Sequence, residues 1–212
     1  MKSYTIPAMN HEIDDLSASD LMNFMESSEN KISVNEKNWA DFPFSPDTLV
    51  TAIHRNQILY LYFEVFNERI RVTHTSDQSP VYEDSCVEMF IQPDSEKYFN
   101  LEFNALGVAL CKSGTNRHDR INLSPGYTQR IDRFSKIQKA GDVNTGTFNW
   151  SLLVKIPFDV IQIEAGKSYR ANFQKCGDLT PDPHFASWNP IRTSKPDFHQ
   201  KDFFGEVRIE KS

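Results

Sequence analysis

The chain has 212 residues, of which 39% are hydrophobic and 25% charged, and its formal net charge is -6 at pH 7. This apolar content excludes a disordered chain, and the acidic balance argues against a nucleic-acid-binding surface, which needs clustered lysine and arginine. We therefore expect a single globular domain over residues 1–212 that takes a neutral or polar ligand and no nucleic acid.

The N-terminal segment, MKSYTIPA, has no apolar stretch as long as that of a signal peptide. Nothing later approaches the ~20 apolar residues of a membrane span, so no membrane partner is expected. As given, the sequence predicts a cytoplasmic location. A chain that had lost a leader would read the same way and would be periplasmic or extracellular.

One short helix is predicted between Ile13 and Met25, where apolar residues recur with helical spacing in places and Ser17 followed by Asp20 fits a capping box. After it, short aromatic and β-branched runs alternate with Pro, Gly, Asn and Asp clusters, which is typical of an antiparallel β protein. The polar stretch from Lys112 to Asn149 predicts a long loop with one or two edge strands.

Six runs have a strong strand pattern: Ile58–Val65, Val87–Ile91, Phe99–Ala105, Trp150–Ile156, Tyr169–Cys176 and Gly205–Glu210. Two runs have a weaker one: Lys31–Asn35 and Ile131–Gln138. Helical stretches do not alternate with these strands, so a parallel α/β sheet is not expected. The predicted fold class is all-β, an antiparallel, jelly-roll-like β-sandwich with one short N-terminal helix.

Three cysteines, Cys86, Cys111 and Cys176, form an odd set with no CxxC pair, and each lies in an apolar, strand-like segment. Buried cysteine commonly behaves as a small hydrophobic residue. We therefore expect three buried free thiols, and a zinc site or a catalytic thiol is the less favoured interpretation.

A turn-like segment joins Val87–Ile91 to Phe99–Ala105, which predicts a hairpin. Side chains alternate in direction along a strand, so the hairpin has one apolar and one mainly polar face. The apolar face carries Val87, Met89, Ile91, Leu101, Phe103 and Ala105, and the other carries Glu88, Phe90, Asn100, Glu102 and Asn104.

If Phe90 lies opposite Asn100, then Glu88 lies opposite Glu102, and directly opposed like charges destabilise a sheet. A bound cation, a neighbouring arginine, a raised carboxyl pKa or a hydroxyl-rich ligand would each compensate. Carboxylates and amides beside aromatic rings are suited to sugar hydroxyls and to the apolar face of a sugar ring. A solvated outer face is an equally good interpretation of the hairpin alone.

Four blocks of sequence resemble the family 9 carbohydrate-binding modules. They are YEDSCVEMFIQP from Tyr82, YFNLEFNALG from Tyr98, SWNP from Ser187 and FHQKDFFGEV from Phe198. The blocks occur in the expected order, the similarity runs from about Ile32 to the C-terminus, and it is greatest to stand-alone members from gut Bacteroidetes. The resemblance implies a β-sandwich with a slot where two aromatic rings hold a terminal sugar of a xylan or glucan chain. It also implies structural calcium in some members and frequent association with glycoside hydrolases such as xylanases.

Carried over by position, the first ring of the slot is Tyr82, where tryptophan is usual in the family. Glu88 matches the glutamate that binds hydroxyl groups. Asn100 and Glu102 stand where the family usually has an arginine and an asparagine, so the resemblance predicts a different pattern of hydrogen bonds to the sugar.

The second ring falls on Phe198, again where tryptophan is more usual, with His199 beside it. Trp188, in the SWNP block, is expected either to support the slot from behind or to enter it. Packing in the core is the competing interpretation of Trp188, because most lone tryptophans pack. The predicted function is non-catalytic carbohydrate binding through these residues.

Three alternatives stay open. Glu88 and Glu102, opposed across two strands, could stand near the ~5–5.5 Å separation of a retaining glycosidase. Related sandwiches hold haem between a methionine and a histidine, but Met89 is expected to point into the core, and no histidine forms an obvious axial pair with it. The acidic pairs Glu83 with Asp84 and Asp178 with Asp182 could contribute to a calcium site, which needs 6–8 oxygen ligands.

Overall fold

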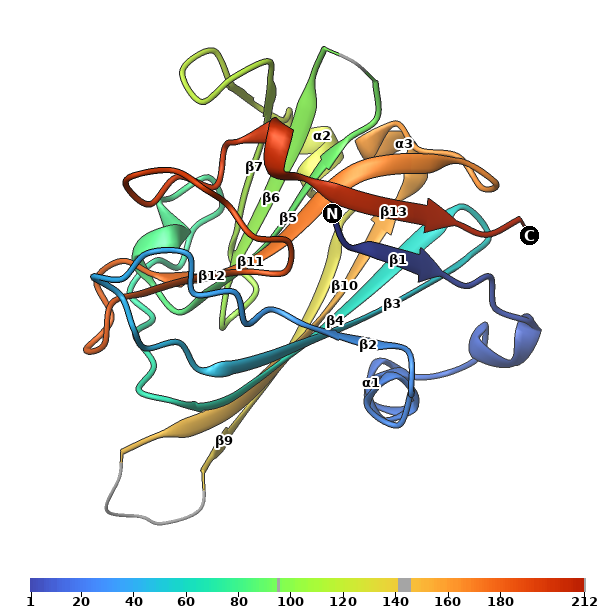
Figure 1. Ribbon diagram of the computed structural model, residues 1–212. Helices are drawn as coiled ribbons and strands as arrows, with labels where there is room; N and C mark the ends of the chain where they lie inside the picture. Colours follow the sequence, from blue (N-terminus) through green and yellow to red (C-terminus); the bar gives the residue numbers. More distant parts are fainter. Residues whose placement is uncertain (95, 141–145, 212) are drawn as a thin grey trace.

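The computed structural model describes residues 1–94, 96–140 and 146–211, whose strands form two stacked sheets (Figure 1). The large sheet has eight strands in these residues: β1 (Ser3–Ile6), β13 (Gly205–Ile209), β11 (Ser168–Gly177), β5 (Cys86–Gln92), β6 (Tyr98–Asn104), β7 (Ala109–Gly114) and β8 (Ile121–Asn122) in that order, with β12 (His184–Ser187) paired to β11. The small sheet has five: β2 (Lys31–Ser33), β3 (Asp47–Arg55), β4 (Ile58–Glu68), β10 (Phe148–Pro157) and β9 (Asp132–Lys139).

The helices in the described residues are short. They are α1 (Ala18–Glu26), α2 (Pro125–Thr128) and α3 (Phe158–Ile161), with single 3-10 turns at His11–Ile13, Val81–Glu83 and Lys201–Phe203. The predicted capping of α1 is confirmed, because the Ser17 side chain accepts a hydrogen bond from the Asp20 backbone N–H. Among the described residues, the helices are all too short or too polar to cross a membrane.

The predicted β-sandwich is confirmed, with one exception to its antiparallel pairing. At the edge of the large sheet, β1 and β13 pair in parallel, with Ser3 opposite Glu206 and Ile6 opposite Ile209. A parallel pair needs a long connection between its strands, and here almost the whole chain separates them. The sequence prediction missed this contact because β1 is only a four-residue run.

The main core lies between the sheets and is built by alternation. On β4, Leu59, Leu61 and Phe63 are fully buried and point into this core. The intervening residues Tyr60 and Tyr62 are also buried, because α1 packs on the outer face of the small sheet. Since both faces of β4 are covered, its sequence is a continuous apolar run rather than an alternating one.

The outer face of the large sheet is covered as well, by loops rather than by a helix. Phe90, predicted on the polar face of the hairpin, is 1% exposed and packs in a second cluster with Tyr98, Trp39 and Phe204. The placement on that face is correct, but a solvated outer face is wrong. Loops from distant parts of the chain enclose its polar residues, which creates the site described below.

The predicted strands correspond to β2, β4, β5, β6, β9, β10, β11 and β13. The stretch from Lys112 holds the end of β7, the two-residue β8 and β9, as the prediction of edge strands anticipated; its residues 141–145 lie outside the described part. The sequence prediction missed β3, β7 and β12. Polar residues and a glycine interrupt the apolar pattern of these strands, and their pairing to neighbouring strands identifies them.

Candidate functional site

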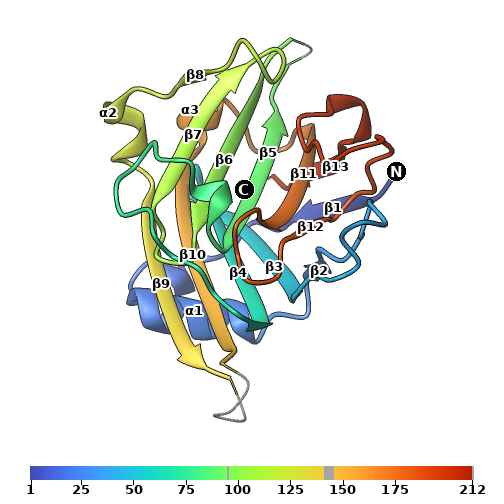
Figure 2. The ribbon, with the colours of Figure 1, turned by 90° about the vertical axis from the view of Figure 1, so that its left-hand side faces the viewer.

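A cavity of about 220 Å³ opens on the outer face of the large sheet, where β7, β6, β5 and β11 lie side by side (Figure 2). Pockets for drug-sized ligands span roughly 300–1,000 Å³, so this one suits a smaller ligand. Its wall is formed by Tyr82, Glu88, Glu102, Leu110, Lys112, Arg117, Arg120, Cys176, Asp178, Phe185, Pro196, Asp197, Phe198 and His199. Five of the seven residues predicted from the sequence therefore share one cavity.

The floor of the cavity is the predicted hairpin. The register of β5 and β6 places Glu88 opposite Glu102 and Phe90 opposite Asn100, as expected. Both glutamates are nearly fully buried, with 2% and 3% of their surface exposed. The strand backbone holds the two carboxyl groups on the same face of adjacent strands.

Each of these carboxyl groups is only half satisfied. Glu88 Oε1 accepts from the Cys176 thiol at 3.1 Å, and Glu102 Oε1 accepts from Asn100 Nδ2 at 2.7 Å. Within the described residues, the Oε2 atoms of both glutamates are buried without a hydrogen-bond partner. A buried polar atom without a partner is costly, so both carboxyl groups would gain from a further hydrogen-bond partner.

The electrostatics of the floor favour protonated carboxyl groups. Burial, and then repulsion by Glu102, raises the pKa of Glu88 well above its usual value. Burial raises the pKa of Glu102 to about 7, although Arg120, whose Nη1 lies 3.7 Å from Glu102 Oε1, opposes the shift. A protonated carboxyl both donates and accepts hydrogen bonds, as a hydroxyl group does.

Asp178 adds a third carboxyl group to the wall. Its backbone N–H donates to the Tyr82 carbonyl at 3.1 Å, which fixes the 3-10 turn that carries Tyr82 against the end of β11. Burial, and then the charge of Glu83, raises the pKa of Asp178 to about 6. Its buried Oδ1 likewise has no hydrogen-bond partner in the described part of the chain.

The two predicted aromatic walls differ in how much ring they present. Tyr82 is 38% exposed, and its side chain is open to a ligand. Phe198 is 8% exposed because its ring packs against Trp39 and Phe185, with centroids 5.9 Å and 6.1 Å apart. Tyr82 is therefore the more accessible stacking face, and Phe198 offers only part of its ring.

His199 lies between the cavity and the second apolar cluster. Its ring stacks on Phe90 with centroids 4.8 Å apart, and its Nδ1 lies 3.0 Å from the Tyr98 hydroxyl. Burial, and then the charge of Arg120, lowers the pKa of His199 to about 2. The imidazole is therefore neutral at physiological pH.

The other two predicted residues do not form the wall. Asn100 is fully buried beneath Glu102 and positions its carboxyl group. Trp188 is 3% exposed and packs in the inter-sheet core with Tyr4 and Phe173, at centroid distances of 6.4 Å and 5.8 Å. Its ring fills the space beside Gly205, where a Cβ would stand 2.5 Å from it. Core packing therefore accounts for Trp188.

Sequence reasoning missed the cationic side of the wall. Leu110 and Lys112 are opposite Glu102 and Asn100 on β7, so recognising β7 as a strand would have placed both on this face. Arg117 and Arg120 come from the loop after β7, where no periodic pattern points to the sheet. Three cations thus line a cavity in a chain of net charge -6.

Three of the four acidic residues proposed above for calcium pair with other groups of the fold. Asp84 is fully buried and accepts from the Arg71 side chain, the Thr73 and His74 backbone N–H groups and Asn104 Nδ2. Its neighbour Glu83 contacts His74, Asp182 pairs with Arg69, and Asp178 faces the cavity.

Met89 and the cysteines are placed as the sequence predicted. Met89 is 1% exposed in the inter-sheet core. All three cysteines are buried free thiols.

Comparison with known proteins identifies relatives of both sequence and fold. The profile of carbohydrate-binding family 9 matches residues 19–209. A candidate carbohydrate-binding protein from Bacteroides uniformis is 28% identical, with a TM-score of 0.86 over 99% of each chain. No curated protein matches the chain.

More distant structures share the fold. A family 9 module from Caldicellulosiruptor kristjanssonii in complex with glucose is 12% identical, with a TM-score of 0.58 over 100% of this chain and 97% of that one. A family 9 module from the same organism in complex with cellotriose is 13% identical, with a TM-score of 0.55 over 100% and 95%. The predicted family resemblance is confirmed.

Proposed function

The chain belongs to carbohydrate-binding family 9, a family of non-catalytic binding modules, and from this premise we propose that its cavity holds a terminal sugar of a xylan or glucan chain. One observation carries the proposal. Glu88, Glu102 and Asp178 each have a buried oxygen without a partner among the described residues, and all three line a cavity that also presents the ring of Tyr82.

These groups match the two chemical surfaces of a pyranose. The raised pKa values of Glu88 and Glu102 let these groups donate to or accept from a sugar hydroxyl near neutral pH, whereas Asp178, with a pKa of about 6, mainly accepts. Tyr82 offers a flat surface to the C–H face of the ring, and Phe198 adds the exposed part of its own.

The size of the cavity supports a chain end rather than an internal unit. A volume of about 220 Å³ leaves room for little more than one sugar ring. The complexes of the Caldicellulosiruptor modules with glucose and cellotriose support a glucose-type unit as the first candidate. Xylose lacks the hydroxymethyl group of glucose. A comparison of the affinities for the two sugars therefore tests whether the cavity wall contacts that group.

The affinity should be modest. A stacked ring is worth about 1 kcal/mol at the low end of the range for aromatic stacking, and each hydrogen bond adds about 0.5–1.5 kcal/mol net. We expect dissociation constants between micromolar and millimolar. Association with a glycoside hydrolase such as a xylanase would raise the effective affinity through avidity.

Calorimetric titration of the wild type and of Tyr82→Ala with glucose, xylose, cellotriose and xylotriose tests the proposal. Loss of the exposed ring should weaken binding about 5-fold, which corresponds to the loss of about 1 kcal/mol of stacking. The melting temperature should change little, because Tyr82 is 38% exposed. Tyr82→Phe keeps the stacking face and should retain most of the affinity.

Tyr127→Ala is the matched control, because Tyr127 is a 45% exposed tyrosine on α2, away from the cavity wall. Unchanged affinity in Tyr82→Ala would contradict the proposed binding slot, and parallel loss of binding and folding would make Tyr82 a structural residue.

Cellotriose with a reduced terminal sugar distinguishes the chain end from internal units. No release of sugar from aryl glycosides is expected, and turnover abolished by Glu102→Gln would favour a glycosidase instead.

A further inference from the structure

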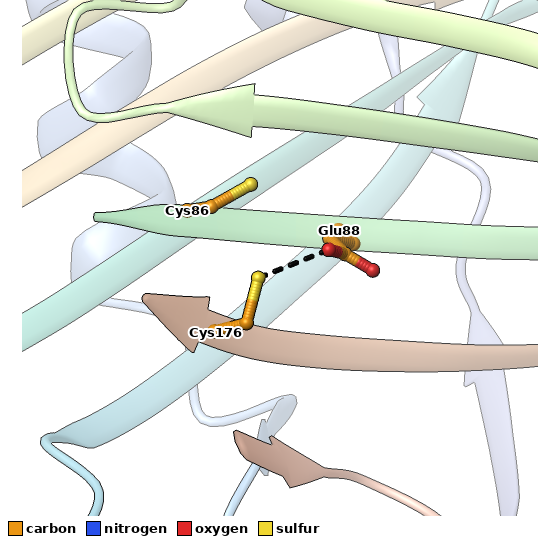
Figure 3. A group of neighbouring side chains, drawn as sticks. All are labelled: Cys86, Glu88 and Cys176. Atoms are coloured by element: carbon orange, nitrogen blue, oxygen red, sulfur yellow. Dashed lines mark hydrogen bonds between the residues drawn. The ribbon is translucent and has the colours of Figure 1, made fainter. Parts of the chain in front are cut away.

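Two of the three free cysteines meet at the floor of the cavity, next to Glu88. Cys86 and Cys176 are register partners on the adjacent strands β5 and β11. One ligand atom each of Cys86, Glu88 and Cys176 lies within 4.8 Å of the others (Figure 3). We propose that these three side chains bind a zinc ion.

The backbone presents the three donors on one side of the large sheet. Cys86 and Glu88 are two residues apart on β5 and point to the same face, and Cys176 lies across from Cys86. With Zn–S bonds near 2.3 Å and Zn–O bonds of 2.0–2.2 Å, donors around a tetrahedral zinc ion stand roughly 3.6–3.8 Å apart. The three donor atoms, which lie within 4.8 Å of one another, would adjust to that spacing around the ion.

The hydrogen bonding of Glu88 is an independent sign of an absent partner. Glu88 is 2% exposed, and the only bond that its carboxyl group makes within the described residues is the one from the Cys176 thiol to Oε1 at 3.1 Å. Its Oε2 has no partner there, and Gln174, the residue opposite Glu88 on β11, also has a buried side-chain amide without partners in the described part. A structural polar cluster is normally satisfied internally.

Cysteine binds zinc as the thiolate, so metal binding at this cluster is coupled to loss of the thiol protons. Zinc binding would release one proton from each thiol, and the proton of Glu88 where it is held, and would replace them with bonds to the metal.

The donor set selects zinc over calcium. Calcium takes six to eight oxygen ligands, whereas two thiolates and a carboxylate are suited to zinc, which is commonly four-coordinate. Glu88 and Cys176 line the cavity, so the fourth position would face it, on the side of Asp178. Arg120, which lines the same cavity as Glu88 and Cys176, would offset the remaining negative charge of the site.

Cobalt is a suitable probe because it substitutes for zinc in tetrahedral thiolate sites and absorbs light. Titration of the reduced protein with Co²⁺ should give thiolate-to-cobalt charge-transfer absorption and intense visible bands that saturate at one ion per chain. Zn²⁺ should abolish the bands by displacement. Elemental mass spectrometry of the protein purified with zinc and then dialysed should find one zinc ion per chain.

Three single variants locate the site. Cys86→Ser and Cys176→Ser should each lose the charge-transfer absorption and bind zinc at least ~10-fold more weakly. Cys111→Ser is the matched control, because Cys111 is an equally buried free thiol that faces the inter-sheet core from β7. It should titrate like the wild type. Circular dichroism establishes that each variant is folded.

Absence of thiolate-to-cobalt absorption in the reduced wild type would overturn the proposal, whatever the variants do. Equal loss in Cys111→Ser would overturn it too, as would a Cys86–Cys176 disulfide whose reduction gives no metal binding. The zinc site does not depend on which sugar is bound, although Glu88 takes part in both proposals. Calorimetry of glucose with metal-free protein tests the sugar site separately, so either proposal can fail while the other stands.

Discussion

Two groups of buried charged residues lie on opposite faces of the large sheet and differ in how completely they are satisfied. Between the sheets, Lys175 Nζ donates to Glu68 Oε1 at 3.0 Å and to the Cys176 carbonyl at 2.9 Å, and it lies 2.8 Å from His184 Nε2. Glu68 Oε2 accepts from Trp150 Nε1 at 2.7 Å. Every carboxylate oxygen of Glu68 therefore has a partner within the protein.

On the outer face, Glu88 and Glu102 are buried to a similar degree but keep oxygens without partners in the described residues. The inter-sheet group joins β11 of the large sheet to β4 of the small one and has no capacity for a ligand. The outer group has carboxyl oxygens without hydrogen-bond partners among the described residues, and a ligand that supplied hydrogen bonds to them would be favoured. Whether the protein itself supplies every hydrogen-bond partner, more than whether the group is buried, separates a structural charged group from a binding site.

The largest effect should come from breaking the inter-sheet group. Glu68→Gln leaves the Lys175 ammonium buried without a counter-charge, and breaking such a pair costs about 3–5 kcal/mol. Urea unfolding should show a loss of that size. Arg130→Gln, which removes a surface pair with Asp159 whose side chains are 47% and 62% exposed, should cost no more than about 1 kcal/mol. Similar losses in both variants would contradict the comparison.

The outer group should respond in the opposite way. Glu102→Gln removes one of two opposed carboxyl groups, so the free energy of unfolding at pH 8 should rise. Sugar binding should weaken, because a neutral hydrogen bond is worth about 0.5–1.5 kcal/mol net, which is roughly 2- to 13-fold in affinity. Calorimetry and urea unfolding of the same variant check both parts. A stability loss with unchanged binding would assign Glu102 to the fold.

The pH dependence of stability gives the smallest effect, because two contributions oppose each other. The pKa of Glu102 is raised from 4.5 to about 7 on folding, so the stability from this group is full below pH 4.5 and is lost as the pH rises through 7. The pKa values of His184 and His199 are lowered to about 3 and about 2, so their contributions are lost as the pH falls below 6.5.

The stability difference between Glu102→Gln and the wild type isolates the carboxyl contribution. This difference should grow from pH 4.5 to about 7 and then level off. Urea midpoints measured at half-unit steps of pH would check it. A difference that is constant with pH would mean that folding does not raise the pKa of Glu102.

The sequence by itself determined the strands of the hairpin and its register. Val87, Met89 and Ile91 alternate with Glu88 and Phe90, and alternation is a local property of an extended backbone, so it predicts which side chains share a face. The opposition of Glu88 and Glu102 followed from that register. The family resemblance added Tyr82, Phe198 and His199, which local patterns could not have joined to the hairpin.

Only the tertiary structure decided what covers each face. Arg120 reaches the site from a loop without periodicity, Trp188 turns into the core instead of the slot, and Cys176 lies beside Glu88 although 88 residues separate them. Whether a polar group is solvated, satisfied or left available depends on which distant segments pack over it. Packing over such distances is a property of the whole fold, and no local pattern in the sequence contains it.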